Sequence, residues 1–205
     1  MKKKIIILGT ILFFFLSLQG LAQGQRSSFH ANVGIAFPKE ENIKSGFESG
    51  FGFSLPLSKK MSLAFDFGYW KSTVHEKLGK LFNGKLSINP FLFSLHYALA
   101  ADKFVAPYIF LGSSLIFTTF KIGKYISIPE ITINQKLENG IGVHLGSGAN
   151  VKLTRNLALF AEISYLYRKA KGKTIITDMN FGVSTKEFSI NLGSLQLGLG
   201  MKYFF

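Results

Sequence analysis

The chain contains no cysteine, so no disulfide can cross-link it and no thiolate can bind a metal ion. Beyond residue 23 it also lacks any apolar run that approaches the roughly 20 residues of a membrane-spanning helix. Charged residues are scarce at 17%, and the acidic ones number 11 against 24 basic ones. These shortages exclude a disulfide-stapled scaffold, a cysteine metal centre and a helical membrane protein. A length of 205 residues suits a single domain.

The first 22 residues have the pattern of a secretory signal peptide. Three lysines follow Met1, an apolar run extends from Ile5 to Leu18, and the small residues Gly20 and Ala22 come next. An uncleaved anchor helix is the alternative, but the apolar run is too short for one. No cysteine follows the cleavage position, which excludes a lipoprotein anchor. We predict a signal peptide over 1–22, cleaved after Ala22, and one domain over 23–205.

Hydrophobic residues in the remaining chain recur at every second position. In LQLGLGMKYFF, which spans 195–205, leucines, Met201, Tyr203 and Phe205 alternate with glycine and polar residues. This period is typical of β-strands with two different faces. Eight such segments are expected, over 29–37, 47–57, 62–69, 91–99, 107–119, 141–151, 157–167 and 195–205. The fifth is apolar on both faces, and its phase stays open.

Two irregularities interrupt the alternation. Leu86 and Ile88 are out of phase with the segment that follows them, which predicts a bulge near Pro90. The last segment is preceded by Phe188, Ile190 and Leu192, with a phase break near 193–194.

The connections between the segments alternate in length. Short ones lie at 58–60, 101–103 and 154–156, and long ones at 38–46, 71–85, 120–139 and 168–188. Short turns at one end and long loops at the other predict an up-and-down meander rather than βαβ units. The stretch KYISIPEITINQK, 124–136, is rich in β-forming residues, and we expect it to extend the barrel above the membrane.

The two faces of these strands decide which solvent the protein meets. One face is Phe, Leu, Ile and Val, and the other is Gly, Ser, Ala and Asn with isolated ionisable residues. A soluble, lipocalin-like barrel needs a polar exterior, which the second face supplies poorly. Aromatic residues stand toward the segment ends, as in the girdles of a lipid-facing wall: Tyr69, Trp70, Tyr97, Tyr165, Tyr167 and Tyr203. We predict an all-β, eight-stranded antiparallel up-and-down transmembrane β-barrel.

With its eight segments, the glycine-rich GIGVHLGSGANVKLTRNLALFAEISYLYRK (140–169) and a final Phe, the chain resembles the small outer-membrane β-barrel families. These include the OmpA-type transmembrane domain and the opacity-like, porin-family adhesins. The resemblance covers roughly residues 27–205 and concerns pattern, not a catalytic motif. It implies the outer membrane of a Gram-negative-type bacterium, with the barrel-assembly machinery as a partner. In those families the C-terminal aromatic residue is an assembly signal, a role that falls here on Phe205, supported by Tyr203.

An apolar exterior turns the ionisable residues of the strands inward. An eight-stranded barrel has little free interior, so these groups must be paired or hydrated. We predict a structural polar network in the lumen, formed by His30, Glu48, Asp66, His96, His144, Lys152, Glu162, Lys202 and, at the outer rim, Arg168. A gated narrow pore or a proton path is the alternative. The three histidines lack a local ligand spacing, so no metal site is expected.

Enzyme motifs are absent or incomplete. In HLGS, His144 points inward and Ser147 points to the opposite face, and the serine lacks the Gly-x-Ser-x-Gly spacing. Gly172-Lys173-Thr174 resembles the end of a P-loop, but Tyr167 occupies the position of the required glycine. We expect no catalytic residue and no cofactor, and keep a lipid A deacylase or acyltransferase as a third hypothesis.

Basic residues gather in the long connections, which hold 14 Lys and Arg against 7 Asp and Glu. The densest group is Arg168, Lys169, Lys171 and Lys173, which we expect to face phosphates of lipopolysaccharide. Simple solubility of Lys-rich loops is the alternative explanation. Nucleic acid is not an expected partner. The first hypothesis is therefore a non-enzymatic structural or adhesin-like surface protein with an unknown extracellular ligand, and the second is a narrow channel.

Overall fold

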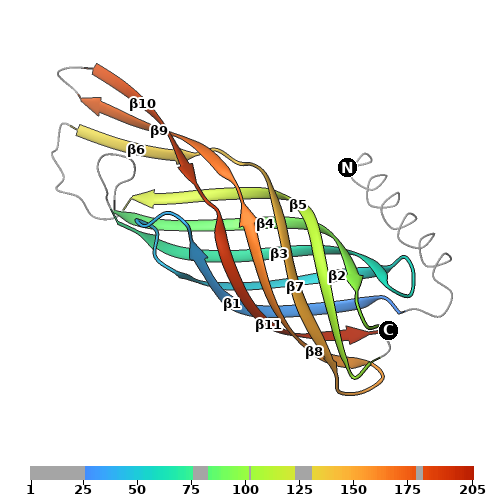
Figure 1. Cartoon of the computed structure of the whole chain (residues 1–205). Helices are drawn as coiled ribbons and strands as arrows, with labels where there is room; N and C mark the ends of the chain where they lie inside the picture. The colour runs from blue at the N-terminus through green and yellow to red at the C-terminus, as the bar shows by residue number, and fades with distance from the viewer. Residues whose placement is uncertain (1–25, 76–82, 102, 123–130, 179–181) are drawn as a thin grey trace, which may run out of the picture.

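The computed structural model describes residues 26–75, 83–101, 103–122, 131–178 and 182–205. The predicted signal peptide, 1–22, lies outside these residues. Across the described ranges the chain forms eleven strands, eight of which close into a barrel (Figure 1). Within the same ranges there is no helix of the length and apolar character needed to cross a membrane.

The barrel is an antiparallel meander in which each strand pairs with the next one of the wall. Its strands are β1 (Ser28–Pro38), β2 (Gly46–Pro56), β3 (Met61–Val74), β4 (Gly84–Ala98), β5 (Val105–Ile122), β7 (Gly140–Lys152), β8 (Leu157–Tyr167) and β11 (Ser194–Phe204). The last strand closes the cylinder against the first, with Ser28 opposite Phe204 and Pro38 opposite Ser194. Closure leaves no strand edge unpaired in lipid. The predicted eight-stranded up-and-down barrel is confirmed.

Two of the long connections contribute a second, three-stranded sheet. It consists of β6 (Ile131–Leu137), β9 (Lys169–Asp178) and β10 (Gly182–Asn191), in the order β10-β9-β6. We call it the cap sheet; it continues the barrel beyond its long-loop end (Figure 1). The expectation that 168–188 is a loop is wrong, and the phase break near 193–194 is the gap between β10 and β11. The β-rich character expected of 124–136 is confirmed from residue 131 onward, and 124–130 lies outside the described residues.

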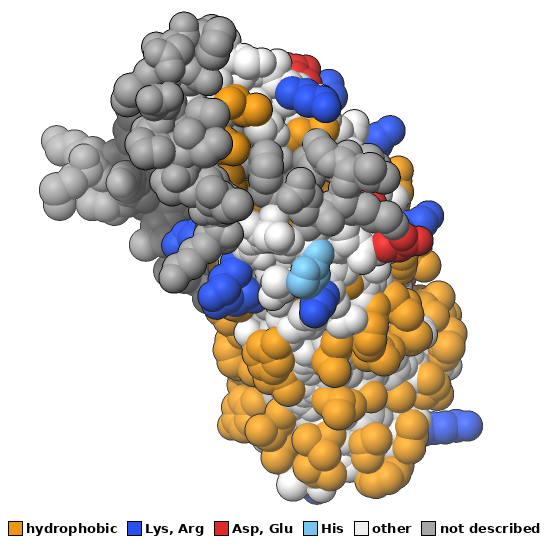
Figure 2. All heavy atoms as spheres, turned by 90° about the vertical axis from the view of Figure 1, so that its left-hand side faces the viewer, with side chains coloured by type: hydrophobic (Ala, Val, Ile, Leu, Met, Phe, Trp, Pro, Cys, Tyr) orange, Lys and Arg blue, Asp and Glu red, His pale blue; other side chains and the backbone are white. Residues whose placement is uncertain are grey.

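Residues of equal parity share a face throughout the barrel. Every pair across the wall joins two odd or two even residues, as in Phe29 with Tyr203 and Val33 with Leu199. The exposed large apolar side chains of the barrel strands are all odd-numbered, which turns the even-numbered ones inward. Figure 2 shows these side chains as an apolar band around the lower part of the molecule. This is the exterior that a transmembrane barrel requires, and the predicted orientation is confirmed.

The register of β4 corrects the bulge predicted near Pro90. Phe91 lies opposite Phe67 and Ile88 opposite Trp70, so no residue is inserted between the two pairs. Leu86 and Ile88 are simply inward-facing and apolar. The same parity settles the fifth segment, in which the even-numbered residues of β5 point inward.

Leu86 and Ile88 of β4 and Ile116 of β5 are apolar although they face inward, because they belong to an apolar core inside the long-loop end of the barrel. We call it the apolar plug: Ala36, Ile43, Trp70, Val74, Leu86, Ile88, Ile116, Leu137, Leu166, Ala170, Ile190 and Leu192. Leu137, Ala170 and Ile190 come from the cap sheet, so the cap packs onto the barrel interior. Leu92, Phe120 and Phe188 pack against the plug. The polar network predicted for the lumen does not extend into this end, which is apolar.

Trp70 belongs to this plug and not to the outer aromatic girdle in which the sequence placed it. Its even number turns it inward, and 1% of its surface is exposed. Tyr69, its neighbour, points outward and is exposed.

We expect Trp70→Ala to destabilise the barrel by about 3 kcal/mol, because it leaves a cavity in a filled interior. Leu199→Ala is the control, since Leu199 is 65% exposed on the outer wall. The measurement is the urea midpoint of the refolded chain, followed by the gel shift between boiled and unboiled samples. Equal midpoints for the two variants would contradict the packing of the plug.

Candidate functional site

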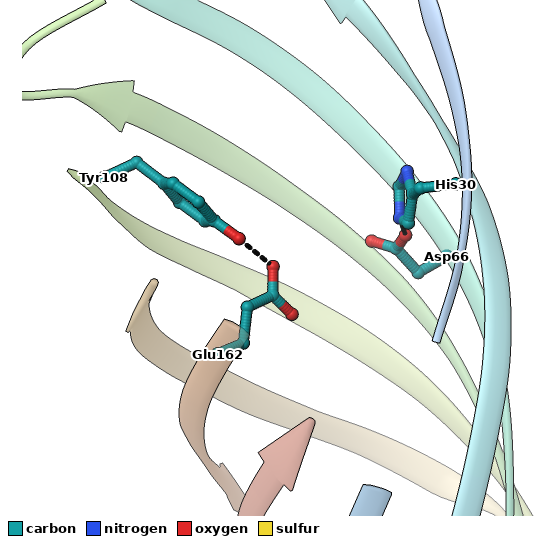
Figure 3. Close-up of polar contacts among 4 residues, drawn as sticks. All are labelled: His30, Asp66, Tyr108 and Glu162. Atoms are coloured by element: carbon teal, nitrogen blue, oxygen red, sulfur yellow. Dashed lines mark hydrogen bonds and ion pairs between the residues drawn. The ribbon is translucent and has the colours of Figure 1, made fainter. Parts of the chain in front are cut away.

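Two short polar pairs lie on the inner wall of the lumen, each reaching over one strand of the barrel (Figure 3). His30 of β1 lies 2.5 Å from the Asp66 carboxylate of β3, measured from Nε2 to Oδ1. The Tyr108 hydroxyl of β5 donates to Glu162 of β8 across 2.5 Å. Each pair joins strands that are not neighbours in the wall, so the contacts brace the cylinder from within.

Aromatic rings surround the remaining charge of this layer. The His96 ring packs against both Tyr108 and Phe110, at centroid distances of 5.5 and 4.9 Å. The Lys202 ammonium lies 5.5 Å from the ring centroids of both Tyr108 and Phe160. A buried cation over two aromatic faces gains cation–π attraction that partly offsets its lost hydration.

Several polar atoms of the middle lumen have no hydrogen-bond partner. They are both ring nitrogens of His144, Nδ1 of His30 and one carboxylate oxygen of Glu48. They border a cavity of about 60 Å³, which has room for a few water molecules. Among the described side chains, no three His, Asp or Glu residues are grouped so that they could hold a metal ion.

Seven of the nine residues predicted for the polar network meet in this middle layer. They are His30, Glu48, Asp66, His96, His144, Glu162 and Lys202. Lys152 does not join them: it lies at the short-turn mouth and donates from Nζ to the Ala101 carbonyl across 2.8 Å. The sequence missed Tyr108 and Phe110, because the phase of their segment could not be read.

Arg168 is also separate from the network and ties the cap sheet to the barrel. Its guanidinium donates to the Ile116 carbonyl at 3.1 Å, to Thr118 Oγ1 at 2.8 Å and to the Glu138 carbonyl. Only 2% of Arg168 is exposed. The structure therefore places it in the rim as a structural contact and not with the exposed lysines that follow it.

Those lysines form one face of the cap sheet. Lys169, Lys171 and Lys173 alternate along β9, and Lys136 of β6 is paired in register with Lys173. All four side chains are exposed. We call these four residues the basic face.

Glu187 of β10 contacts the basic face through one ion pair, with Lys173 Nζ 3.0 Å from its carboxylate. The opposite face of the cap sheet packs toward the apolar plug, so the basic face points outward.

The Lys173–Glu187 pair makes the cap sheet sensitive to acid. The hydrogen bond and charge of Lys173 lower the pKa of Glu187 below its ordinary value of 4.5. A lowered folded-state pKa gives stability that is present above the ordinary value and lost as pH falls through the folded value. We expect the protection factors of the β9–β10 amides, which correct the exchange rates for their intrinsic pH dependence, to fall below pH 4.5 in the native chain. In Glu187→Gln the same amides should lose this dependence; an unchanged profile would contradict the pair.

The His30–Asp66 pair depends on a missing side chain at residue 52. A Cβ on Gly52 would overlap the Asp66 carboxylate and lie 2.7 Å from His30 Nε2. We expect Gly52→Ala to lower the free energy of unfolding by about 3 kcal/mol, as when a buried pair is broken. Gly198→Ala is the matched control, because its Cβ meets nothing closer than 3.6 Å. Urea unfolding of both variants tests this, and a stable Gly52→Ala protein would refute it.

The predicted assembly residues lie at the closing seam. Tyr203 points outward opposite Phe29, and the Phe205 amide donates to the Ser27 carbonyl across 3.0 Å. The Phe205 ring packs on Phe53 with a centroid distance of 5.9 Å. Their role in recognition by the assembly machinery stays a prediction.

The fold is similar to solved outer-membrane barrels. OprG from Pseudomonas aeruginosa superposes with a TM-score of 0.73 at 15% identity, covering 88% of this chain and 97% of that one. Neisserial surface protein A superposes with a TM-score of 0.59 at 18% identity, covering 87% of this chain and 97% of that one. Ail, the attachment invasion locus protein of Yersinia pestis, has a TM-score of 0.51 at 14% identity, covering 88% of this chain and 99% of that one. No protein-family model and no curated protein sequence matches this chain. The resemblance to small outer-membrane barrels is thus confirmed at the level of fold.

Proposed function

We propose that this chain is a non-enzymatic outer-membrane protein that holds the basic face of its cap sheet at the cell surface. The short turns and the chain ends then face the periplasm, and the cap sheet faces outside. The apolar band of the wall supports the membrane setting, and OprG, a neighbour in fold, is an outer-membrane protein by name. Export by the segment 1–22 is part of this proposal.

The observation that carries the proposal is the arrangement of charge on the cap sheet. Four exposed lysines lie on one face of β6 and β9, and Glu187 is the carboxylate that pairs with them among the described residues. A rigid sheet presents these ammonium groups at fixed spacing, which suits a surface with repeated phosphates. Lipopolysaccharide is therefore the first partner that we propose, and an anionic extracellular ligand fits the same chemistry.

The other hypotheses have less support. A narrow channel needs a wetted path, whereas the apolar plug fills the long-loop end of the lumen. For a lipid-modifying enzyme, the HLGS stretch supplies no serine–histidine pair, since His144 and Ser147 of β7 differ in parity and so lie on opposite faces of the wall. Ser164, which lines the same cavity as His144, donates a hydrogen bond to Gln196. The surface role is the hypothesis in which the cap sheet and its basic face have a function.

The test compares the native full chain with K169S/K171S/K173S, each refolded in phosphatidylcholine nanodiscs. Binding to immobilised lipopolysaccharide should fall roughly tenfold in the variant, since each exposed charge contact contributes about 0.5 kcal/mol. Added salt should weaken the native binding and narrow the difference.

K44S/K85S/K121S is the control, because it removes the same charge from the long-loop end without touching the basic face. It should bind almost as the native chain does. If both variants lose binding equally, net charge and not the basic face is responsible, and the proposal fails.

A further inference from the structure

The short-turn end of the barrel is also strongly basic. Outside the four long connections, the chain from residue 26 onward has seven basic residues. Lys202 lies in the middle lumen, and the other six belong to the short-turn end: Arg26, Lys59, Lys60, Lys103, Lys152 and Arg155. The same part of the chain, outside the long connections, has four acidic residues. Three of them are Glu48, Asp66 and Glu162 of the middle lumen. The fourth, Asp102, lies outside the described residues.

A pocket of about 630 Å³ opens at this end, inside the mouth of the barrel. Arg26, Lys59, Lys152 and Arg155 line it, and no Asp or Glu of the described residues does. The rest of its wall is largely apolar, from Ala98, Ala101, Ala106, Leu153 and Phe204. Its volume is within the range of small-molecule sites.

A second pocket of about 150 Å³ adjoins the first and leads inward. The two share Arg26, Lys59, Asn150 and Phe204, and the inner one reaches Lys202 and His96. Asn150, which lines both, has a buried side-chain oxygen position without a hydrogen-bond partner. Because the amide oxygen and nitrogen can exchange places, this position can present an N–H donor. A side-chain amide of Asn150 without a hydrogen-bond partner, where the two pockets meet, points to a ligand that supplies that partner.

Two of the four cations of the mouth, Arg26 and Lys152, are held in place by the backbone and a neutral side chain. Arg26 Nη1 donates to Asn156 Oδ1 at 3.0 Å and to the Arg155 carbonyl at 3.4 Å. Lys152 donates to the Ala101 carbonyl. Within the described part of the chain none of the four lining cations has a carboxylate partner. Among the described residues, therefore, no Asp or Glu neutralises their remaining N–H donors, which favours an anion.

The opposite end of the lumen contains the apolar plug, so this mouth is the route by which a ligand reaches the basic pocket. We propose that the basic mouth is a binding site for an organic phosphate with an apolar body, namely the headgroup of an anionic phospholipid in the adjoining leaflet. The cations bind the phosphate, while Phe204, Leu153 and the alanines contact the glycerol and the first acyl carbons. This site is independent of the basic face and of any surface ligand.

Native mass spectrometry of the full chain tests the proposal, after release from nanodiscs of equal phosphatidylglycerol and phosphatidylcholine. The native chain should retain phosphatidylglycerol preferentially, and K59Q/K152Q/R155Q should lose this preference at least about tenfold, because charge-assisted bonds to phosphate are lost. K59R/K152R should keep it. The gel shift on boiling confirms that each variant is folded.

The surface variant K169S/K171S/K173S is the matched control, since it removes three charges at the other end and should retain phosphatidylglycerol fully. A second arm titrates soluble glycerol phosphate. If a low concentration of glycerol phosphate displaces the lipid, the site belongs to a free organic phosphate. If it does not displace the lipid, the result supports the lipid headgroup. Equal lipid retention by the native chain and K59Q/K152Q/R155Q would overturn the proposal, whatever the basic face binds.

Discussion

In a hydrocarbon solvent every backbone N–H and C=O must find its partner within the protein. This chain meets that constraint by pairing β11 with β1, and the other features of the barrel follow from the closed ladder. Because all the pairs in the wall join residues of equal parity, a single alternation sorts the whole chain into an outer and an inner set. The outer set is apolar and meets lipid. The inner set is free to vary along the axis, and that variation distinguishes the two ends.

The interior changes character from one end to the other. A basic mouth leads to a middle layer with paired His30, Asp66, Tyr108 and Glu162, and then to the apolar plug. Two kinds of cross-brace therefore hold the cylinder, one by hydrogen bonds and one by packing. The cap sheet is attached by both kinds, since Arg168 hydrogen-bonds to the barrel and three residues of the sheet pack into the plug.

Much of the fold was readable from the sequence, because a period of two is a direct consequence of strand geometry. The segment 157–167 coincides with β8, and the others differ mainly where the inner face turns apolar. There the alternation vanishes, so Leu86 and Ile88 suggested a bulge and β5 had no readable phase. Trp70 was misplaced for the same reason, since an aromatic residue near a strand end can face either way.

The site was only partly predictable. Parity sufficed to turn all nine ionisable residues inward, but it does not show height along the axis. It therefore could not separate Lys152 and Arg168 from the seven residues that share the middle layer. The connections that form the cap sheet could not be assigned a partner, because pairing between β6 and β9 spans distant parts of the chain. The basic mouth is assembled from short turns and chain ends that carry one or two charges each.

The apolar plug has a consequence for how the interior exchanges protons. Water and hydronium reach His96 from the mouth with the short turns, and His30 and His144 border an interior cavity that His96 also lines. Among the described residues, the other entrance is packed with side chains. The lumen therefore equilibrates with one compartment alone. In the orientation proposed above, acidification of the medium reaches these histidines only after the space beneath the membrane has itself become acidic.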